Sequence, residues 1–180
     1  TIFNVLGPLS NPANANFLIL VVYDKKLVLP TADVISDLGV KRAMVVHSEE
    51  GLDEISCEKD TYVAELDEDK ITEYTINPKD FDLEISPLES LKVNTVEESY
   101  KIFINMLGNN DKAAVNIVSL NAGAAIYIAG IKENLKSGIK FAKEIIESGK
   151  AMKKFEDIKK SMPEKIKTPQ ILKEILENKA

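Results

Sequence analysis

The most constraining feature of this sequence is the uninterrupted apolar segment 17–23, which reads FLILVVY. Its β-branched residues favour a strand, and the absence of polar residues indicates that both faces of that strand are covered. The next stretch, 24–38, has a helical pattern that we expect Pro30 to interrupt and Gly39 to end. A second apolar strand follows at 42–47. A strand, a helix and a strand in this order predict a βαβ unit, and therefore an α/β fold.

The rest of the chain adds a hairpin and then helices. Residues 61–66 and 71–76 alternate β-favouring residues around an acidic turn, which predicts a hairpin. Thr95 and Glu98 have the spacing of a capping box, which would open a helix that ends at Gly108. We expect three further helices, the first of them capped by Asp111, at 111–130, 135–148 and from about residue 151.

The segment 113–131 contains no charged residue and could be mistaken for a membrane span. Three polar side chains interrupt it, and its alanines and glycines contribute little hydrophobicity, so we expect a buried helix and no membrane partner. A glycine inside a helix is unfavourable relative to alanine, so Gly123 indicates close approach of a neighbouring helix. The interrupting polar residues are Asn116, Ser119 and Asn121.

Composition excludes several classes of protein. The chain is 44% hydrophobic and 29% charged, as in an ordinary globular domain. A net charge of −6 disfavours nucleic-acid binding, because phosphates are bound by clustered Lys and Arg. The single cysteine, Cys57, suits a reducing, cytoplasmic location, and we expect it to be a packed thiol. We expect the only histidine, His47, to be hydrogen-bonded and structural rather than a general base.

Two adjacent carboxylates, Asp53 and Glu54, follow the second strand after a turn at Gly51. Mg²⁺ takes oxygen ligands and usually combines one or two carboxylates with substrate phosphates and water. The pair could therefore bind Mg²⁺, or could be two solvated turn residues, and the residues alone leave this choice open. The loop at 6–14, which contains Gly7 and Pro8, could line a pocket for a flat ligand or be an ordinary connection.

Several segments occur together in this chain and resemble the anthranilate phosphoribosyltransferase family over roughly residues 1–160: NVLGPLSNPAN, VVHSEEGLDEIS, LNAGAAIYIAG and SGIKFAKEIIESGKA. The resemblance implies an α/β fold with a mixed, mainly parallel sheet flanked by helices, like the C-terminal domain of nucleoside phosphorylases and phosphoribosyltransferases. It implies transfer of phosphoribose from phosphoribosyl pyrophosphate (PRPP) to anthranilate in tryptophan biosynthesis, giving N-(5'-phosphoribosyl)anthranilate and pyrophosphate. It also implies that Asp53 and Glu54 bind Mg²⁺, and that Gly7 and Pro8 border the anthranilate channel.

The family's other substrate-binding parts have no counterpart in the sequence. Its glycine-rich pyrophosphate loop, the arginine that meets anthranilate and the helical domain that forms the homodimer all precede the matching region. Glu98-Ser99-Tyr100 also replaces the family's common Glu-Asn-Ala. We therefore expect the C-terminal part of the enzyme, with an incomplete sheet, an exposed apolar edge that promotes self-association, and no activity by itself. Residues 161–180 are expected to be a helical extension or the start of a linker.

Three alternatives to this function remain. A pyrimidine nucleoside phosphorylase would share the scaffold, but the loop at 6–14 and the Asp53–Glu54 pair argue against it. A nucleic-acid-binding relative is disfavoured by the negative charge. The sequence also leaves open that the chain is a folded remnant of the enzyme with no activity of its own.

Overall fold

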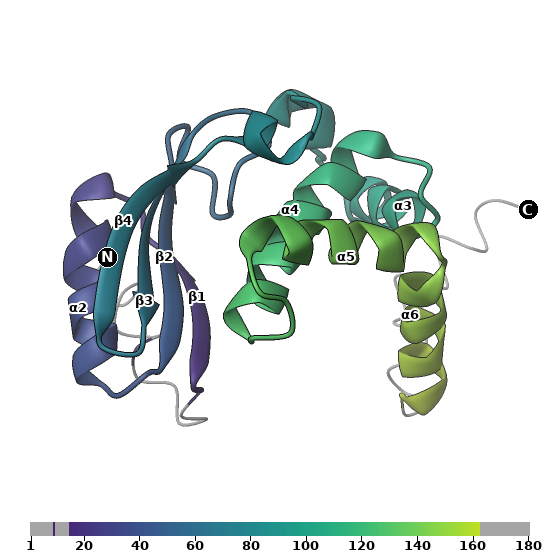
Figure 1. Ribbon diagram of the computed structural model, residues 1–180. Coiled ribbons are helices and arrows are strands. Elements are labelled where there is room, and N and C mark those ends of the chain that lie inside the picture. Colours follow the sequence, from purple (N-terminus) through teal and green to yellow (C-terminus); the bar gives the residue numbers. More distant parts are fainter. Residues whose placement is uncertain (1–8, 10–14, 163–180) are drawn as a thin grey trace, which may run out of the picture.

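The computed structural model describes residue 9 and residues 15–162. A four-stranded sheet lies at the centre of one half, with helix α2 on one side and α4 and α5 on the other (Figure 1). The strands are β1 (Phe17–Val21), β2 (Arg42–Ser48), β3 (Thr61–Asp67) and β4 (Lys70–Ile76). The α-helices are α2 (Val28–Asp37), α3 (Val96–Leu107), α4 (Lys112–Ile128), α5 (Leu135–Glu147) and α6 (Lys150–Ser161). Short 3₁₀ helices occupy Lys25–Leu27, Pro78–Phe81 and Leu88–Leu91.

The sheet is mixed, as expected, with the strand order β1-β2-β3-β4. Strands β1 and β2 are parallel, whereas β2–β3 and β3–β4 are antiparallel. The expectation of a mainly parallel sheet is therefore wrong for the described strands. The reason is the type of connection, since α2 is a crossover helix, while a tight hairpin joins β3 to β4 and can only produce antiparallel neighbours.

The βαβ unit is confirmed, with one correction at Pro30. This proline lies in the first turn of α2 and does not interrupt the helix. Backbone N–H groups in a first turn have no partner within the helix, so proline is tolerated there. Gly39 follows the end of α2 with a φ of 80°, a left-handed conformation that glycine adopts easily.

The predicted caps and turns are also confirmed. Thr95 and Glu98 form a reciprocal capping box at the start of α3. The Asp111 carboxylate accepts a hydrogen bond from the Ala114 N–H at 3.1 Å and caps α4. In the β3–β4 hairpin, Asp67 pairs with Lys70 across a two-residue turn. These features depend on nearby residues, which is why the sequence predicted them.

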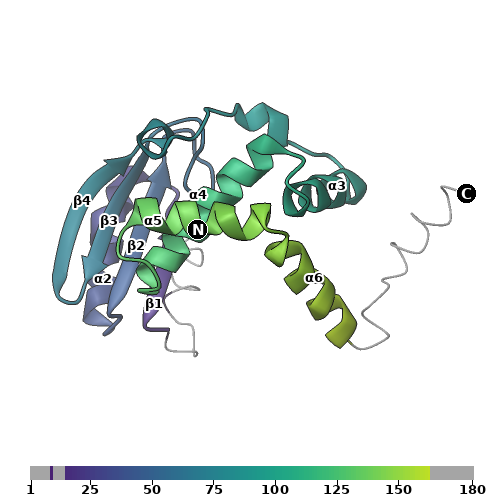
Figure 2. The ribbon, with the colours of Figure 1, turned by 45° about the vertical axis from the view of Figure 1, so that its right-hand side comes forward.

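Alternate residues of β2 divide the core into two parts. Ala43 and Val45 face the side covered by α2, while Met44 and Val46 pack with residues of α4. Figure 2 shows α4 and α5 beside the sheet and α6 extending away from it. Helix α4 is therefore the expected buried central helix. Among the residues that the structure describes, no helix is long and apolar enough to cross a membrane.

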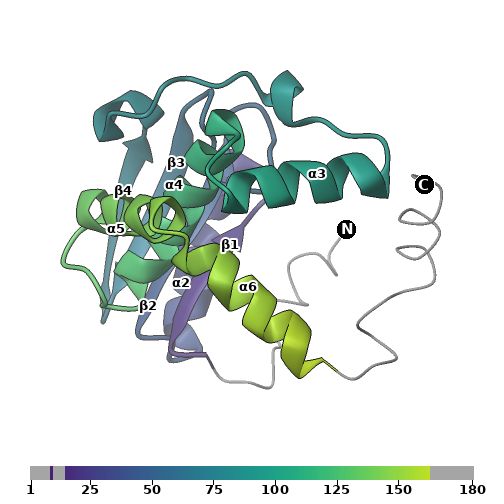
Figure 3. The same cartoon turned by 90° about the vertical axis from the view of Figure 1, so that its right-hand side faces the viewer.

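Helices α4 and α5 approach each other at a pair of glycines. A Cβ added to Gly123 would lie 2.4 Å from the Ile139 Cα, and one added to Gly138 would lie 2.3 Å from the Gly123 carbonyl oxygen. The close packing predicted at Gly123 is confirmed. Figure 3 shows α3 and α6 in front of the sheet. Phe103 of α3 meets Phe155 of α6 edge-to-face, with 5.0 Å between ring centroids.

Strand β1 is at one edge of the described sheet, and its first residue, Phe17, is 48% exposed. An apolar strand edge of this kind can pair with another chain, and the self-association expected from it stays a prediction. Helix α6 ends at Ser161, and the predicted domain boundary near residue 160 stays a prediction. Residues 163–180 lie outside the described part, so the nature of the extension stays a prediction.

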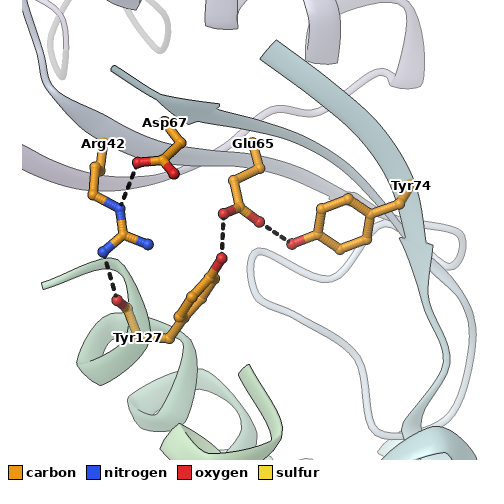
Figure 4. Close-up of polar contacts among 5 residues, drawn as sticks. All are labelled: Arg42, Glu65, Asp67, Tyr74 and Tyr127. Atoms are coloured by element: carbon orange, nitrogen blue, oxygen red, sulfur yellow. Dashed lines mark hydrogen bonds and ion pairs between the residues drawn. The ribbon is translucent and has the colours of Figure 1, made fainter. Parts of the chain in front are cut away.

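A polar network fastens the carboxyl end of α4 to the sheet (Figure 4). Arg42 of β2 donates from Nη1 to the Tyr127 carbonyl oxygen at 3.1 Å, and its Nε lies 3.2 Å from the Asp67 carboxylate. The hydroxyls of Tyr127 and Tyr74 each donate to one oxygen of Glu65 at 2.6 Å. Burial and the Glu65 carboxylate raise the pKa of Tyr127 to about 12 and also raise that of Tyr74. Both phenols therefore remain hydrogen-bond donors at neutral pH.

Candidate metal and phosphate site

The Asp53–Glu54 pair lies in the loop between β2 and β3. This loop begins where β2 ends at Ser48, beside the carboxyl end of the parallel strand β1. In open α/β sheets, ligands bind outside the carboxyl ends of parallel strands. Gly51 turns the chain with a φ of 77° just before the pair. The structure therefore places Asp53 and Glu54 in the loop that follows the carboxyl end of β2, beside the carboxyl end of β1.

The two carboxylates influence each other. Both residues are exposed by surface area, yet the loop shields the Glu54 carboxyl from part of the solvent. This desolvation, followed by repulsion from Asp53, raises the pKa of Glu54 above its usual range. A bound cation would relieve the same repulsion, because it favours the ionised form of both groups.

The backbone on either side of the pair is held by two side chains. The Ser48 hydroxyl donates to the Leu52 carbonyl oxygen at 2.9 Å. Asn121 of α4 accepts from the Ile55 N–H at 2.9 Å and donates from Nδ2 to the Ile55 carbonyl oxygen at 2.9 Å. Ser48 and Ile55 are completely buried. The stretch from Leu52 to Ile55 is therefore attached at both ends.

A third carboxylate, Glu50, lies deeper in the loop. One of its oxygens accepts a hydrogen bond from the Ser56 hydroxyl, and the other is buried without a hydrogen-bond partner among the described residues. Ser56 is in turn fixed by its backbone N–H, which donates to the Thr61 hydroxyl oxygen at 3.0 Å. The loop therefore carries negative charge in excess of what its own hydrogen bonds compensate.

Cys57 and His47 are structural, as the sequence predicted. Cys57 is 2% exposed, and burial, followed by the nearby Glu50 and Glu54 carboxylates, raises the pKa of its thiol to about 12. Such a thiol is a poor nucleophile at neutral pH. The Nδ1 atom of His47 lies 2.8 Å from the Val22 carbonyl oxygen, to which it donates, and so joins the ends of β1 and β2.

The donor set of the loop fits Mg²⁺ bound together with a phosphate ligand. Asp53 and Glu54 offer hard oxygen ligands, and among the described residues no group of three or more His, Cys, Asp or Glu side chains is arranged to hold a metal. Two carboxylates are too few for a site built only from protein, but they suffice where phosphates and water complete the coordination.

Sequence reasoning missed the two side chains that hold the loop. Asn121 was significant only as a polar interruption of an apolar helix, and Ser48 only as part of a polar run. An asparagine that interrupts an apolar helix was the available signal, since an amide that packing removes from water must find partners. The other predicted site residues, Gly7 and Pro8, lie outside the described residues, so their role stays a prediction.

Comparison with known proteins places the chain in a family. Residues 1–152 match the family model described as "Glycosyl transferase family, a/b domain". The chain belongs to this family. The anthranilate phosphoribosyltransferase of Petrotoga mobilis is 46% identical over 158 residues, which are 88% of this chain and 46% of that protein. That of Persephonella marina is 45% identical over 160 residues, or 88% of this chain and 47% of that protein.

Solved structures of anthranilate phosphoribosyltransferases are also similar to this chain over about half of their length. The crystal structure of anthranilate phosphoribosyltransferase from Thermus thermophilus has a TM-score of 0.76 and 36% identity, and covers 84% of this chain and 45% of its own. The Saccharomyces cerevisiae enzyme in complex with PRPP and Mg has a TM-score of 0.74 and 27% identity, and covers 87% of this chain and 45% of its own. The chain thus spans about half the length of the relatives it matches.

Proposed function

We propose that this chain is the C-terminal part of an anthranilate phosphoribosyltransferase, which transfers phosphoribose from PRPP to the amine of anthranilate. The observation that carries the proposal is the Asp53–Glu54 pair, whose backbone is held by hydrogen bonds beside the carboxyl ends of β1 and β2. The chain that carries this pair is 46% identical to such an enzyme. We propose a cytoplasmic enzyme that acts on small molecules and not on nucleic acid, in keeping with the net charge of −6.

In this proposal Asp53 and Glu54 would hold Mg²⁺ together with the pyrophosphate of PRPP. When bound, the ion neutralises the negative charge that develops on the departing pyrophosphate. The chain's own residues hold the two carboxylates at the edge of the sheet and keep Cys57 protonated, so that the thiol does not react. Anthranilate needs orientation more than a strong base, because its amine is already nucleophilic. We assign Gly7 and Pro8 to the wall of the anthranilate site.

The metal assignment can be tested by Mn²⁺ titration of the 180-residue chain, followed by electron paramagnetic resonance with and without pyrophosphate. We expect pyrophosphate to strengthen Mn²⁺ binding to the wild-type chain and not to the Asp53→Asn/Glu54→Gln variant. The matched control is Glu68→Gln/Asp69→Asn, which removes another adjacent acid pair, in the β3–β4 turn. Equal binding by the wild type and the Asp53→Asn/Glu54→Gln variant would contradict the assignment.

A second experiment tests whether the chain is active by itself. We expect no loss of anthranilate fluorescence when the 180-residue chain is mixed with PRPP, Mg²⁺ and anthranilate, because about half of each relative's length lies outside the matched region. Measurable consumption of anthranilate would refute this expectation. Homodimer formation by the complete enzyme is likewise proposed, and sedimentation of the complete enzyme would test it.

A further inference from the structure

Asn121 is an unusual residue for its position on α4. This helix is largely apolar, yet the Asn121 carboxamide makes three hydrogen bonds within it and across to the loop. It accepts from the Ile55 N–H at 2.9 Å, and donates to the carbonyl oxygens of Ile55 at 2.9 Å and Ile117 at 3.0 Å. One side chain thus satisfies both backbone groups of a buried residue 66 positions away in the sequence.

The residue that Asn121 holds is the one directly after the acid pair. On the other side of the pair, the Ser48 hydroxyl holds the Leu52 carbonyl oxygen at 2.9 Å. Between these two attachments neither the Asp53 nor the Glu54 carboxylate is tied down by a hydrogen bond to another described residue. Both are therefore free to bind a ligand while the backbone that carries them is fixed.

Helix α4 is a firm support for this attachment. Its carboxyl end is bound to the sheet through Tyr127, which contacts Arg42 and Glu65 (Figure 4). Its middle packs against α5 at the Gly123–Gly138 contact. A displacement of Asn121 relative to the sheet would break these contacts, so the position of Ile55 follows that of the helix.

We propose that Asn121 and Ser48 are positioning residues for the metal site, holding Asp53 and Glu54 close together against their mutual repulsion. This inference rests on the proposed function. Like charges separate when their backbone is free to move, and a site whose ligands must first be brought together binds its ion more weakly. Groups that orient metal ligands commonly affect metal affinity about 10- to 100-fold.

The test compares Mn²⁺ affinity in the presence of pyrophosphate among variants of the 180-residue chain. Asn121→Leu keeps most of the side-chain volume and removes all three hydrogen bonds. We expect it to raise the Mn²⁺ dissociation constant about tenfold. The matched control is Asn116→Leu, the same substitution on the same helix, which removes a hydrogen bond to the Glu84 carbonyl oxygen instead of one to the loop. We expect it to change the constant less than about twofold.

Ser48→Ala provides a second variant, which keeps the proposal testable if Asn121→Leu does not fold. It removes the hydrogen bond from the Ser48 hydroxyl to the Leu52 carbonyl oxygen. We expect the Mn²⁺ dissociation constant to rise by about as much as in Asn121→Leu. Amide hydrogen exchange supplies an independent readout, since the Ile55 N–H should exchange faster in Asn121→Leu than in Asn116→Leu.

The outcomes separate the two proposals. If the wild type shows no Mn²⁺ binding that depends on Asp53 and Glu54, the proposed function and the positioning role both fail. If that binding is present but Asn121→Leu and Ser48→Ala leave it unchanged, only the positioning role fails. The positioning role also fails if Asn116→Leu weakens binding as much as Asn121→Leu, because the effect would then reflect general loosening of α4.

Discussion

The contact between α4 and α5 leads to a quantitative prediction for Gly123→Ala. The added methyl group would lie 2.4 Å from the Ile139 Cα and 2.5 Å from its backbone nitrogen, where carbon contacts require about 3.5 Å. The clashing atoms belong to backbone and cannot rotate away, so the two helices must separate by about 1 Å. Gly138 offers no relief by sliding, because it meets the Gly123 carbonyl at the same point.

The expected cost combines two opposing effects. Overpacking a close contact costs about 1–3 kcal/mol, and the upper end applies to backbone atoms. Replacing glycine by alanine within a helix returns about 1 kcal/mol. We therefore expect Gly123→Ala to lower the free energy of unfolding by about 2 kcal/mol. For a chain of this size, this corresponds to a fall in Tm of about 4–8 °C.

Urea unfolding monitored by circular dichroism measures this change, provided that the slope with denaturant is the same for both proteins. The reciprocal control is Ala125→Gly, at an exposed position on the same helix, which should lose about 1 kcal/mol through helix propensity alone. If helix propensity alone governed both sites, Gly123→Ala would raise the free energy of unfolding by as much as Ala125→Gly lowers it. A Gly123→Ala protein as stable as the wild type would refute the steric argument.

Three further predictions concern single side chains. At about pH 8 the Cys57 thiol of the native protein should be alkylated about a thousandfold more slowly than a free thiol, because its pKa is raised to about 12. The alkylation rate should keep rising as the pH approaches that pKa. A rate that levels off near the pKa of an ordinary thiol would contradict this. Because the pKa of Glu54 is raised in the folded state, ionisation of this carboxyl destabilises the fold. The stability that the protonated form provides is fully present below the ordinary carboxyl pKa and is lost as the pH rises through the folded-state pKa. Without metal, Glu54→Gln should therefore be more stable than the wild type at about pH 7, with a gain that disappears on acidification, and urea midpoints that differ equally at every pH would count against it. Thr95→Ala should lower the free energy of unfolding by about 1 kcal/mol through loss of the α3 cap, and an unchanged urea midpoint would show that the capping box contributes nothing.

Much of the fold could be predicted from the sequence because its signals are local. The apolar run at 17–23, the turn glycine Gly39 and the capping residues Thr95 and Asp111 each act on neighbours within a few positions. Gly123 was also informative, since a glycine inside a helix has a cost that only a close contact explains. The balance of parallel and antiparallel pairs was predicted wrongly, because it came from the family resemblance and not from the hairpin that the residues themselves indicated.

The candidate site shows the same division. The sequence by itself determined which carboxylates could bind a metal, since Asp53 and Glu54 are adjacent and follow a strand through a glycine turn. The tertiary structure decided how they are held, because the attachment of Ile55 to Asn121 joins residues 66 positions apart. Such a bond depends on how α4 packs against the sheet, through the Gly123 contact and the Tyr127 network. Local propensities fix the elements, whereas burial and packing between distant segments decide which polar groups meet.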